Sequence, residues 1–475
     1  MAARVAIQKL RVLLISANRC ATPEPVFPLG LAHLNAAARR AGHEVRWLDS
    51  LFEQEQLGTV LTEFAPDVVG VSVRNIDDVL IGKREVFVTG LKELVETVHR
   101  GCSTKVILGG SGFSIFPREL LDWTGADYGI VGAGETAFVD LLEALCIRKE
   151  PTAIAGLVFR RGNELIINPP AGPGSAIHLS DTDWPPRLLS YYLQRGGVLN
   201  LQTQRGCGHR CCYCSYPLIE GRRHRNRDAE EVVEEFEQVR RLGADYVFLV
   251  DSVFNSSAAH VTAVCEALLR RNVKVRWGCF LRPQGLSREL ISLMARAGLA
   301  HIEFGSDSFC DEVLAAYQKD FSFEDVFQST ELARNAEIDF CHFVIAGGPG
   351  ETSATLDQGF ENSRSLGGAI ILAMPGMRIY PGTALYERAL AEGLLPSGLN
   401  LLKPAYYLAP GLTLEGVLNS LRGFAARSPN WIVGNFAPGY EKLVARLRQR
   451  GVTGPLWSYF AAAQRLWPHG GLSAP

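Results

Sequence analysis

The chain has 475 residues, of which 47% are hydrophobic and 21% are charged, and its formal net charge is −2. This length predicts two or three domains, and this composition is typical of a globular protein and excludes a mostly disordered one. The near-neutral charge argues against a nucleic acid or an anionic membrane as the main partner.

The N-terminus and the apolar runs bear on where the protein works. The first residues lead directly into a strand-like segment at 11–16, without the pattern of a signal peptide. The longest uncharged apolar stretch, at about 366–377, contains three glycines and a proline and is too short to span a membrane. We therefore expect a cytoplasmic protein with no integral membrane segment.

The first part of the chain alternates short apolar runs with amphipathic segments. Strands are expected at 11–16, 44–49, 67–73, 105–110 and 128–134. Helices are expected at about 28–41, 86–99 and 135–146. This alternation predicts a parallel, doubly wound, flavodoxin-like sheet whose ligands lie on the loops beyond the carboxyl ends of the strands.

A second alternating region follows a connector at 147–185, which has Pro/Gly turns and a predicted hairpin. Six more strands are expected at about 197–204, 246–251, 274–280, 301–306, 340–346 and 369–380. Six βα units predict a partial (β/α)6 barrel with its chemistry on the loops after the strands. The expected domains are an α/β domain at 1–150, a linker at 151–190, the barrel at 191–390 and a helical region at 391–475.

The chain has eleven cysteines, which should be mostly reduced in a cytoplasmic protein. Seven stand singly, as expected of small buried hydrophobes, at positions 20, 102, 146, 265, 279, 310 and 341. The other four lie within 207–214, where Cys207, Cys211 and Cys214 form a C-x3-C-x2-C spacing directly after a predicted strand. Thiolates are the ligands that Fe–S clusters select, and three of them on a [4Fe–4S] cubane leave one iron open for chemistry. Cys212 adjoins Cys211 and is expected to be structural.

A structural zinc site is the main alternative for these cysteines. It would use the same three thiolates with His209 or a distant fourth ligand. Zinc knuckles usually present paired C-x2-C units, and the sequence holds no second pair. The spacing and its place after the first barrel strand favour the cluster.

The segment around the cysteines resembles the radical S-adenosylmethionine (SAM) superfamily in its spacing, its preceding strand and Tyr213 before the third cysteine. The resemblance covers about 190–390. It implies that the open iron binds the amino and carboxylate groups of SAM, and that an electron delivered through the cluster cleaves SAM to methionine and a 5′-deoxyadenosyl radical. That radical would remove a hydrogen atom from the substrate.

Three further segments resemble the family and follow its order along the chain. At the second strand, where the family often has GGE, VFLVDSVFN carries Asp251 and Ser252, and IEFGSDS resembles a fourth-strand GxES segment. FVIAGGPGET resembles the fifth-strand GxPGET segment, whose glycines permit close approach to the adenine side. Arg282 is a candidate for the SAM carboxylate or a substrate anion, and a surface arginine is the alternative. The implied SAM-binding residues are Asp251, Ser252, Arg282, Ser306, Asp307, Gly347 and Gly348.

The N-terminal region resembles the cobalamin-binding arrangement of the large cobalamin-dependent radical SAM group. The resemblance rests on the segments at 27–49, 67–73, 107–112 and 129–138. It implies cobalamin contacts at Ser72, Asn75, Gly109, Gly110, Ser111, Gly132, Gly134 and Glu135.

The cobalt-ligating D-x-H-x-x-G motif of better-known cobalamin domains is missing, because none of the ten histidines has Asp two residues before it. The cobalt would then have no protein ligand on the lower face of the corrin. That face would be open, occupied by water, or covered by Asn75 or Ile76. A sheet that has lost the cofactor and serves as a lid is the alternative. A dinucleotide site is disfavoured, since no G-x-G-x-x-G follows the first strand.

The resemblance implies a cobalamin-dependent radical SAM enzyme that methylates an unactivated carbon of a small-molecule or lipid metabolite. A reductant such as flavodoxin or ferredoxin would supply the electron. One alternative keeps the radical step but performs ring formation, coupling or rearrangement, of lipid or tetrapyrrole type. Another is a non-catalytic Fe–S or zinc module for electron transfer or assembly. Core packing is expected for the C-terminal aromatic residues, and an apolar substrate pocket is the alternative. These residues are Trp431, Phe436, Trp457, Tyr459 and Phe460.

Overall fold

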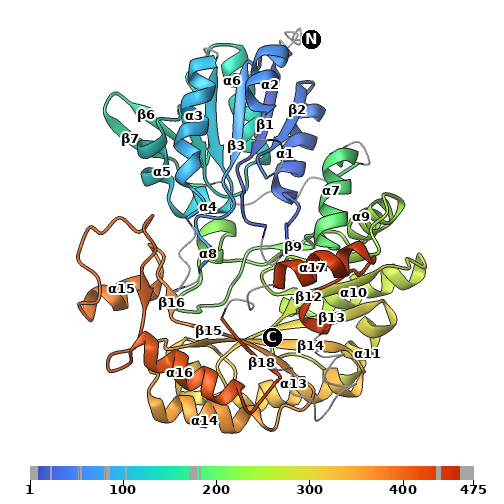
Figure 1. Cartoon of the computed structure of the whole chain (residues 1–475). Coiled ribbons are helices and arrows are strands. Elements are labelled where there is room, and N and C mark those ends of the chain that lie inside the picture. Colours follow the sequence, from blue (N-terminus) through green and yellow to red (C-terminus); the bar gives the residue numbers. More distant parts are fainter. Residues whose placement is uncertain are drawn as a thin grey trace. The chain divides into compact units, whose positions relative to one another are not determined.

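The computed structural model describes residues 9–21, 24–51, 53, 56–79, 81, 86–101, 104–170, 179–180, 183–434 and 440–459 (Figure 1). The chain divides into two compact units. Unit 1 contains residues 1–78, 85–189 and 215–222, and unit 2 contains residues 79–84, 190–214 and 223–475. The expected four-part division into domains stays a prediction.

Unit 1 is built on one seven-stranded sheet of order β2-β1-β3-β4-β5-β6-β7. Its strands are β1 (Arg11–Ser16), β2 (Glu44–Asp49), β3 (Val68–Ser72), β4 (Lys105–Gly109), β5 (Tyr128–Ile130), β6 (Leu157–Arg161) and β7 (Glu164–Ile167). The first five strands are parallel in the flavodoxin order, which confirms the doubly wound fold. The connector forms the predicted hairpin, which extends the sheet as β6 and β7.

Unit 1 also contains helices, several of which connect its parallel strands. They are α1 (Leu29–Arg40), α2 (Leu57–Phe64), α3 (Thr89–Gly101), α4 (Ser111–Ile115), α5 (Pro117–Thr124), α6 (Glu135–Cys146) and α8 (Tyr216–Glu220), while α7 (Pro186–Gly196) leads into unit 2. The sequence did not predict α2, α4 and α5, because each is only five to eight residues long and has little periodicity. Apolar side chains of α1, α6 and the strands form the core of this unit.

Unit 2 contains a second seven-stranded sheet, and all its strand pairs are parallel. In spatial order the strands are β18 (Trp431–Val433), β15 (Ile370–Pro375), β14 (Asp339–Ala346), β13 (Leu299–Asp307), β12 (Arg276–Leu281), β11 (Tyr246–Leu249) and β8 (Leu199–Leu201). Six of these are the predicted barrel strands. The seventh, β18, lies in the region expected to be helical, because three residues are too few to show strand alternation.

The strands of unit 2 are connected mainly by helices, as a barrel of βα units requires (Figure 1). These are α9 (Ala229–Arg241), α10 (Ala258–Arg270), α11 (Arg288–Arg296), α12 (Asp311–Ala316), α13 (Phe323–Asn335), α14 (Ser353–Ser363), α15 (Ala384–Ala391), α16 (Leu414–Ala425) and α17 (Tyr440–Gln449). Two short antiparallel pairs complete the unit: β9 (Gln204–Arg205) with β10 (Arg225–Asn226), and β16 (Met377–Arg378) with β17 (Tyr406–Tyr407).

Two of the C-terminal aromatic residues pack in the core, as predicted. Trp431 lies edge-on to Phe360 and Phe424, with ring centroids 5.4 and 5.3 Å away. Trp457 packs in a buried cluster with Cys341 and Ile370 of the barrel strands. Phe436 and Phe460 lie outside the described residues. Among the described residues, no helix combines the length and the apolar character needed to cross a bilayer.

Candidate active site

The three predicted cluster ligands lie in one loop after β8, which we call the cluster loop (residues 203–214). Cys207 is buried, whereas Cys211 and Cys214 are partly exposed, and none of the three forms a disulfide. The amide of Cys214 donates to the carbonyl of Cys211 over 3.2 Å, so these two cysteines share one turn of backbone. Three soft sulfur ligands, which leave one iron without a protein ligand, are the donor set that an open [4Fe–4S] cubane needs.

His209, the fourth zinc ligand considered from the sequence, is engaged by another residue. Its Nδ1 lies 2.6 Å from Nη1 of Arg282. The thiolates of a [4Fe–4S] cubane bind three different irons and need no histidine ligand. The position of His209 therefore favours the cluster over a zinc site that uses this residue.

The start of the cluster loop is held by the residues that follow β11. One carboxylate oxygen of Asp251 accepts the amides of Thr203 and Gln204 over 2.7 and 3.0 Å, and the other accepts the Thr203 hydroxyl over 2.6 Å. The Ser252 hydroxyl donates to the carbonyl of Gly206 over 2.8 Å. Asp251 is completely buried. Both residues thus contact the protein backbone just before the first cysteine, and their predicted contact with SAM stays a prediction.

The middle of the loop is held by Arg282, at the end of β12. Besides its bond to His209, the guanidinium forms an ion pair with Asp320 and lies over the ring of Phe321 at 5.0 Å. Burial, and secondly the Arg282 charge, lower the pKa of His209 to about 4, so the imidazole is neutral at pH 7. The amide of Gly208 is close to His224, whose Nε2 lies 3.1 Å away. Arg282 is therefore buried and engaged with the loop, and it is not a surface arginine.

The end of the loop contacts a buried ion pair between Asp307 and Lys319. Asp307, at the end of β13, accepts the Tyr213 hydroxyl and the Lys319 ammonium. Nζ of Lys319 also lies 3.2 Å from Oη of Tyr213. Burial alone would lower the pKa of Lys319, but Asp307 outweighs it and raises the pKa to about 12, so the lysine is a permanent cation. Burial raises the pKa of Cys211, and this ammonium opposes that shift and favours the thiolate.

Sequence reasoning missed Lys319, because a single lysine after a short helix forms no pattern. Its only signal was its position in the loop after the fourth barrel strand, where ligands of such barrels are held. Ser306, by contrast, was among the residues predicted to contact SAM. It is completely buried, with its hydroxyl 2.7 Å from Nδ1 of His342. Its contact with SAM stays a prediction.

The glycine turn after β14 (residues 346–351) lies beside these groups in the parallel sheet. The carboxylate of Glu351 accepts the amide of Gly347, whose φ of 91° favours glycine. The amide of Gly348 donates to the hydroxyl of Tyr317 over 3.2 Å. Burial raises the pKa of Glu351 to about 7. The turn that was predicted to face the adenine is therefore fixed from within by two buried side chains.

The predicted cobalamin residues of unit 1 come together at the carboxyl ends of β3, β4 and β5. Ser72 pairs with Gly109 in the β3–β4 register, and Ser111 donates to the carbonyl of Arg74 over 2.9 Å. Gly110 has a φ of 97°, and a Cβ there would lie 2.6 Å from the Val73 carbonyl oxygen.

The other predicted cobalamin residues lie at the same edge of the sheet. Gly132 has a φ of 79° and donates to the Ser114 hydroxyl over 3.0 Å, and Gly134 and Glu135 begin α6. Oδ1 of Asn75 is buried without a hydrogen-bond partner. A glycine-rich edge with an unsatisfied amide oxygen fits a large polar cofactor whose ring and tail lie against backbone.

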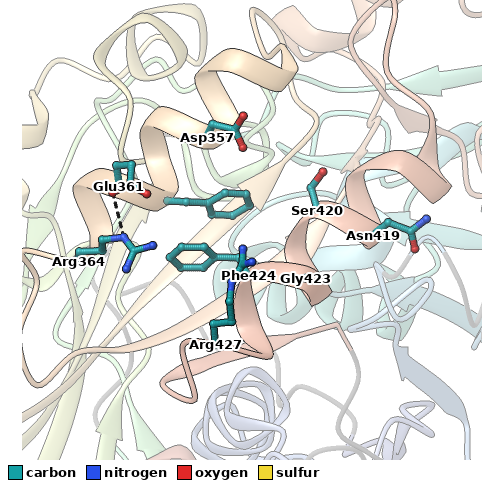
Figure 2. A pocket seen from close by; sticks show the side chains of 9 residues that line it. Asp357, Glu361, Arg364, Asn419, Ser420, Gly423, Phe424 and Arg427 are labelled. Carbon is teal, nitrogen blue, oxygen red and sulfur yellow. Dashed lines mark ion pairs between the residues drawn. The ribbon is translucent and has the colours of Figure 1, made fainter.

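A separate groove lies between α14 and α16 (Figure 2). The rings of Phe360 and Phe424 stack in it at 4.5 Å, and Arg364 lies over Phe424 while pairing with Glu361 over 3.0 Å. None of the predicted site residues lines this groove. It belongs to the helical layer of the barrel and not to the loops after the strands.

Comparison with known families agrees with both sites. The radical SAM superfamily model matches residues 201–360, and the B12 binding domain model matches residues 20–142. The chain contains a radical SAM domain and a B12 binding domain. The radical SAM match includes the cluster loop and the glycine turn, and the B12 binding match includes the glycine-rich sheet edge of unit 1. The two matches confirm the two predicted cofactor-binding domains and the assignment as an enzyme.

Relatives of this chain include methyltransferases. It is 27% identical over 454 residues to tryptophan 2-C-methyltransferase of Streptomyces laurentii, covering 81% of this chain and 75% of that one. It is 28% identical over 350 residues to hopanoid C-3 methylase of Methylococcus capsulatus, covering 69% and 64%. The solved structure of the methyltransferase TsrM from Kitasatospora setae, with cobalamin and a [4Fe-4S] cluster bound, has the same fold. It matches with a TM-score of 0.86 and 24% identity, over 97% of this chain and 98% of that one.

Proposed function

We propose that the protein is a cobalamin-dependent radical SAM methyltransferase that acts on a small molecule. The observation that carries this proposal is a single chain with two sets of candidate cofactor-binding residues. They are three cysteines outside any disulfide in a tightly held loop, and a glycine-rich sheet edge within the segment that matches the B12 binding domain. When bound, the cluster with SAM supplies a carbon radical, and cobalamin supplies a transferable methyl group. The relatives named above are methyltransferases, which supports methylation over ring formation, coupling or rearrangement.

The residues of the chain would prepare this chemistry by holding groups in place. Cys207, Cys211 and Cys214 would hold the cluster, and the Lys319 ammonium would favour the thiolate form of Cys211. The glycine turn would bring backbone close to SAM, with Gly347 and Gly348 as the contact points. Fixed geometry of this kind keeps the reacting atoms aligned and keeps water away from a reactive radical.

The chemical class of the substrate is a finer proposal. Likeness to tryptophan 2-C-methyltransferase over most of both chains supports a small metabolite with an unactivated carbon. A lipid is the second candidate, supported by the likeness to hopanoid C-3 methylase over a shorter alignment. We also propose an external reductant of the flavodoxin or ferredoxin type, because reductive cleavage of SAM at the cluster consumes an electron.

The test is an anaerobic assay on reconstituted full-length protein with methyl-labelled SAM and a metabolite panel. We expect release of 5′-deoxyadenosine and S-adenosylhomocysteine, and a label-dependent mass shift in one substrate. Cys211→Ala should lose the iron–sulfur absorbance and 5′-deoxyadenosine release. The matched control Cys146→Ala replaces a partly exposed cysteine on α6 and should change neither. A wild-type protein that holds iron and cobalt but forms neither product would overturn the proposal.

A further inference from the structure

One buried residue, Tyr317, contacts both the cluster loop and the glycine turn. It follows the last residue of α12 as its C-cap, so its carbonyl has no partner within the helix. That carbonyl accepts the amide of Cys212 over 2.9 Å. The carbonyl of Cys212 in turn accepts the amide of Leu385 over 2.8 Å. Both main-chain polar groups of Cys212, which lies between two predicted cluster ligands, are thus hydrogen-bonded.

The side chain of Tyr317, unlike its carbonyl, contacts the glycine turn. Its hydroxyl donates to the carbonyl of Ile345 over 2.7 Å and accepts the amide of Gly348 over 3.2 Å. Oε2 of Glu351 lies 3.5 Å from the same hydroxyl. The ring fills the space beside Gly348, where a Cβ would lie 2.3 to 2.5 Å from three of its atoms. Only glycine fits at position 348 while the tyrosine is in place.

Neither the cluster loop between its cysteines nor the glycine turn belongs to the regular sheet. Backbone of this kind keeps its position through side-chain contacts and not through a ladder of hydrogen bonds. Tyr317 is completely buried, so both of its polar groups must be satisfied by protein. A displacement of the ring at the glycine turn would therefore be transmitted to Cys212 through the same residue.

We propose that Tyr317 is a positioning residue that fixes the cluster loop and the glycine turn in one mutual geometry. The inference rests on the proposed function, in which SAM contacts both segments at once. Tyr317 would set the distance between the ligand positions on the cluster and those on the turn. It would touch neither the cluster nor the substrate, and it would act through Cys212 and Gly348.

The first test uses Tyr317→Phe in the full-length, anaerobically reconstituted protein. This variant keeps the ring and the main-chain contact with Cys212 and loses the hydroxyl. We expect iron content to stay at the wild-type level and the dissociation constant for SAM to rise about tenfold, as for a buried hydrogen bond that is lost. We also expect the electron paramagnetic resonance spectrum of the reduced cluster at saturating SAM to differ from that of the wild type.

The second test is a double-mutant cycle between Gly348 and Tyr317. Gly348→Ala should push the ring and change the spectrum of the cluster even without SAM, although the substitution is in the glycine turn. In a Tyr317→Leu background the same substitution should have little further effect on the spectrum or on SAM binding, because the space has been vacated. The matched control Gly359→Ala adds a methyl group in α14, where no atom lies within 4 Å of it, and should leave both unchanged.

Two outcomes would overturn the inference. One is a Tyr317→Phe protein with wild-type SAM affinity and a wild-type spectrum. The other is an additive cycle, in which Gly348→Ala has the same effect in both backgrounds, as mere core packing would give. Failure of the proposed function looks different, because the wild-type protein itself would then neither bind SAM at the cluster nor cleave it.

Discussion

At the scale of single residues, Asp251 shows how one buried carboxylate can fix the backbone that precedes a metal-binding loop. It accepts three hydrogen bonds from Thr203 and Gln204, and the Thr203 hydroxyl also lies 2.9 Å from Nε2 of His260. Asp251→Asn replaces one acceptor oxygen by a donor that faces other donors. We expect a loss of about 2–3 kcal/mol in the free energy of unfolding. Urea unfolding measures it, and iron retained after gel filtration should fall.

The neighbouring Ser252 provides the matched comparison for this prediction. Ser252→Ala removes only the bond to the Gly206 carbonyl, so it should cost about 1 kcal/mol and retain most of the iron. If Asp251→Asn keeps wild-type stability and iron but loses SAM affinity, the carboxylate faces the cofactor, as the sequence alone suggested.

Glu351 makes a prediction about pH. Burial raises its pKa to about 7, above the value in an unfolded chain. Between about pH 4.5 and pH 7 the folded state therefore keeps a proton that the unfolded state releases, and the free energy of unfolding falls as pH rises through this window. Glu351→Gln cannot titrate, so its unfolding temperature should decline less than that of the wild type between pH 5 and pH 8. Titration of Glu351 should lower the free energy of unfolding of the wild type by about 2–3 kcal/mol over this range.

Wild type and Glu351→Gln must be compared because the buried histidines change stability with pH in the opposite direction to Glu351. Burial lowers the pKa of His301 and His342 to about 3, so their contributions to stability are lost as pH falls. These contributions are the same in both proteins and cancel in the difference. Parallel pH curves for wild type and Glu351→Gln would show that the carboxyl group does not titrate in this range.

Residue patterns in the sequence predicted only part of the site. The cysteine spacing was sufficient to propose the three cluster ligands, because closely spaced cysteines outside a disulfide framework have few other roles. Lys319 and Tyr317 were missed, since their roles depend on the sheet bringing them beside residues about a hundred positions away. Spacing also could not show that the carboxylate of Asp251 is already engaged by backbone amides.

At the scale of elements, the apolar runs predicted the parallel strands well, and the short elements were missed. The C-terminal segment is an example, because it supplies both β18 and a cap on the barrel interior. The Trp457 indole donates to Glu303 over 2.9 Å, and its ring lies edge-on to His301 at 5.6 Å. This contact joins the end of the described chain to β13. No periodicity in the sequence connects residues 154 positions apart.

Removal of the Trp457 side chain tests this cap. Trp457→Ala would leave a cavity against Cys341 and Ile370 and remove one hydrogen-bond donor to the buried Glu303 carboxylate. We expect a loss of about 3–5 kcal/mol in the free energy of unfolding, measured by denaturant titration. Leu394→Ala is the control, because Leu394 is 43% exposed and should cost little. Equal stabilities of the two variants would contradict a core role for Trp457.

At the scale of the whole molecule, each unit has its own set of predicted cofactor-binding residues. A substitution that abolishes binding of one cofactor should therefore leave the other cofactor bound. Gly110→Ala places a Cβ 2.6 Å from the Val73 carbonyl oxygen at a φ that favours glycine. We expect it to lose corrinoid absorbance and cobalt while keeping iron. Cys211→Ala should show the reverse, with cobalt kept and iron lost, and both variants should lose methyl transfer. Metal analysis of the purified proteins, together with their visible spectra, measures this.

A control separates the loss of cobalamin from a general effect of an added methyl group in unit 1. Gly30→Ala adds the same methyl group in α1, where no atom lies within 4 Å, and should load both metals at wild-type levels. The reason for the expected separation is physical, because each edge is completed by hydrogen bonds within its own unit. If Gly110→Ala lost iron as well as cobalt while remaining folded, loading of the cluster would depend on cobalamin. The two edges would then have to be treated as one coupled site.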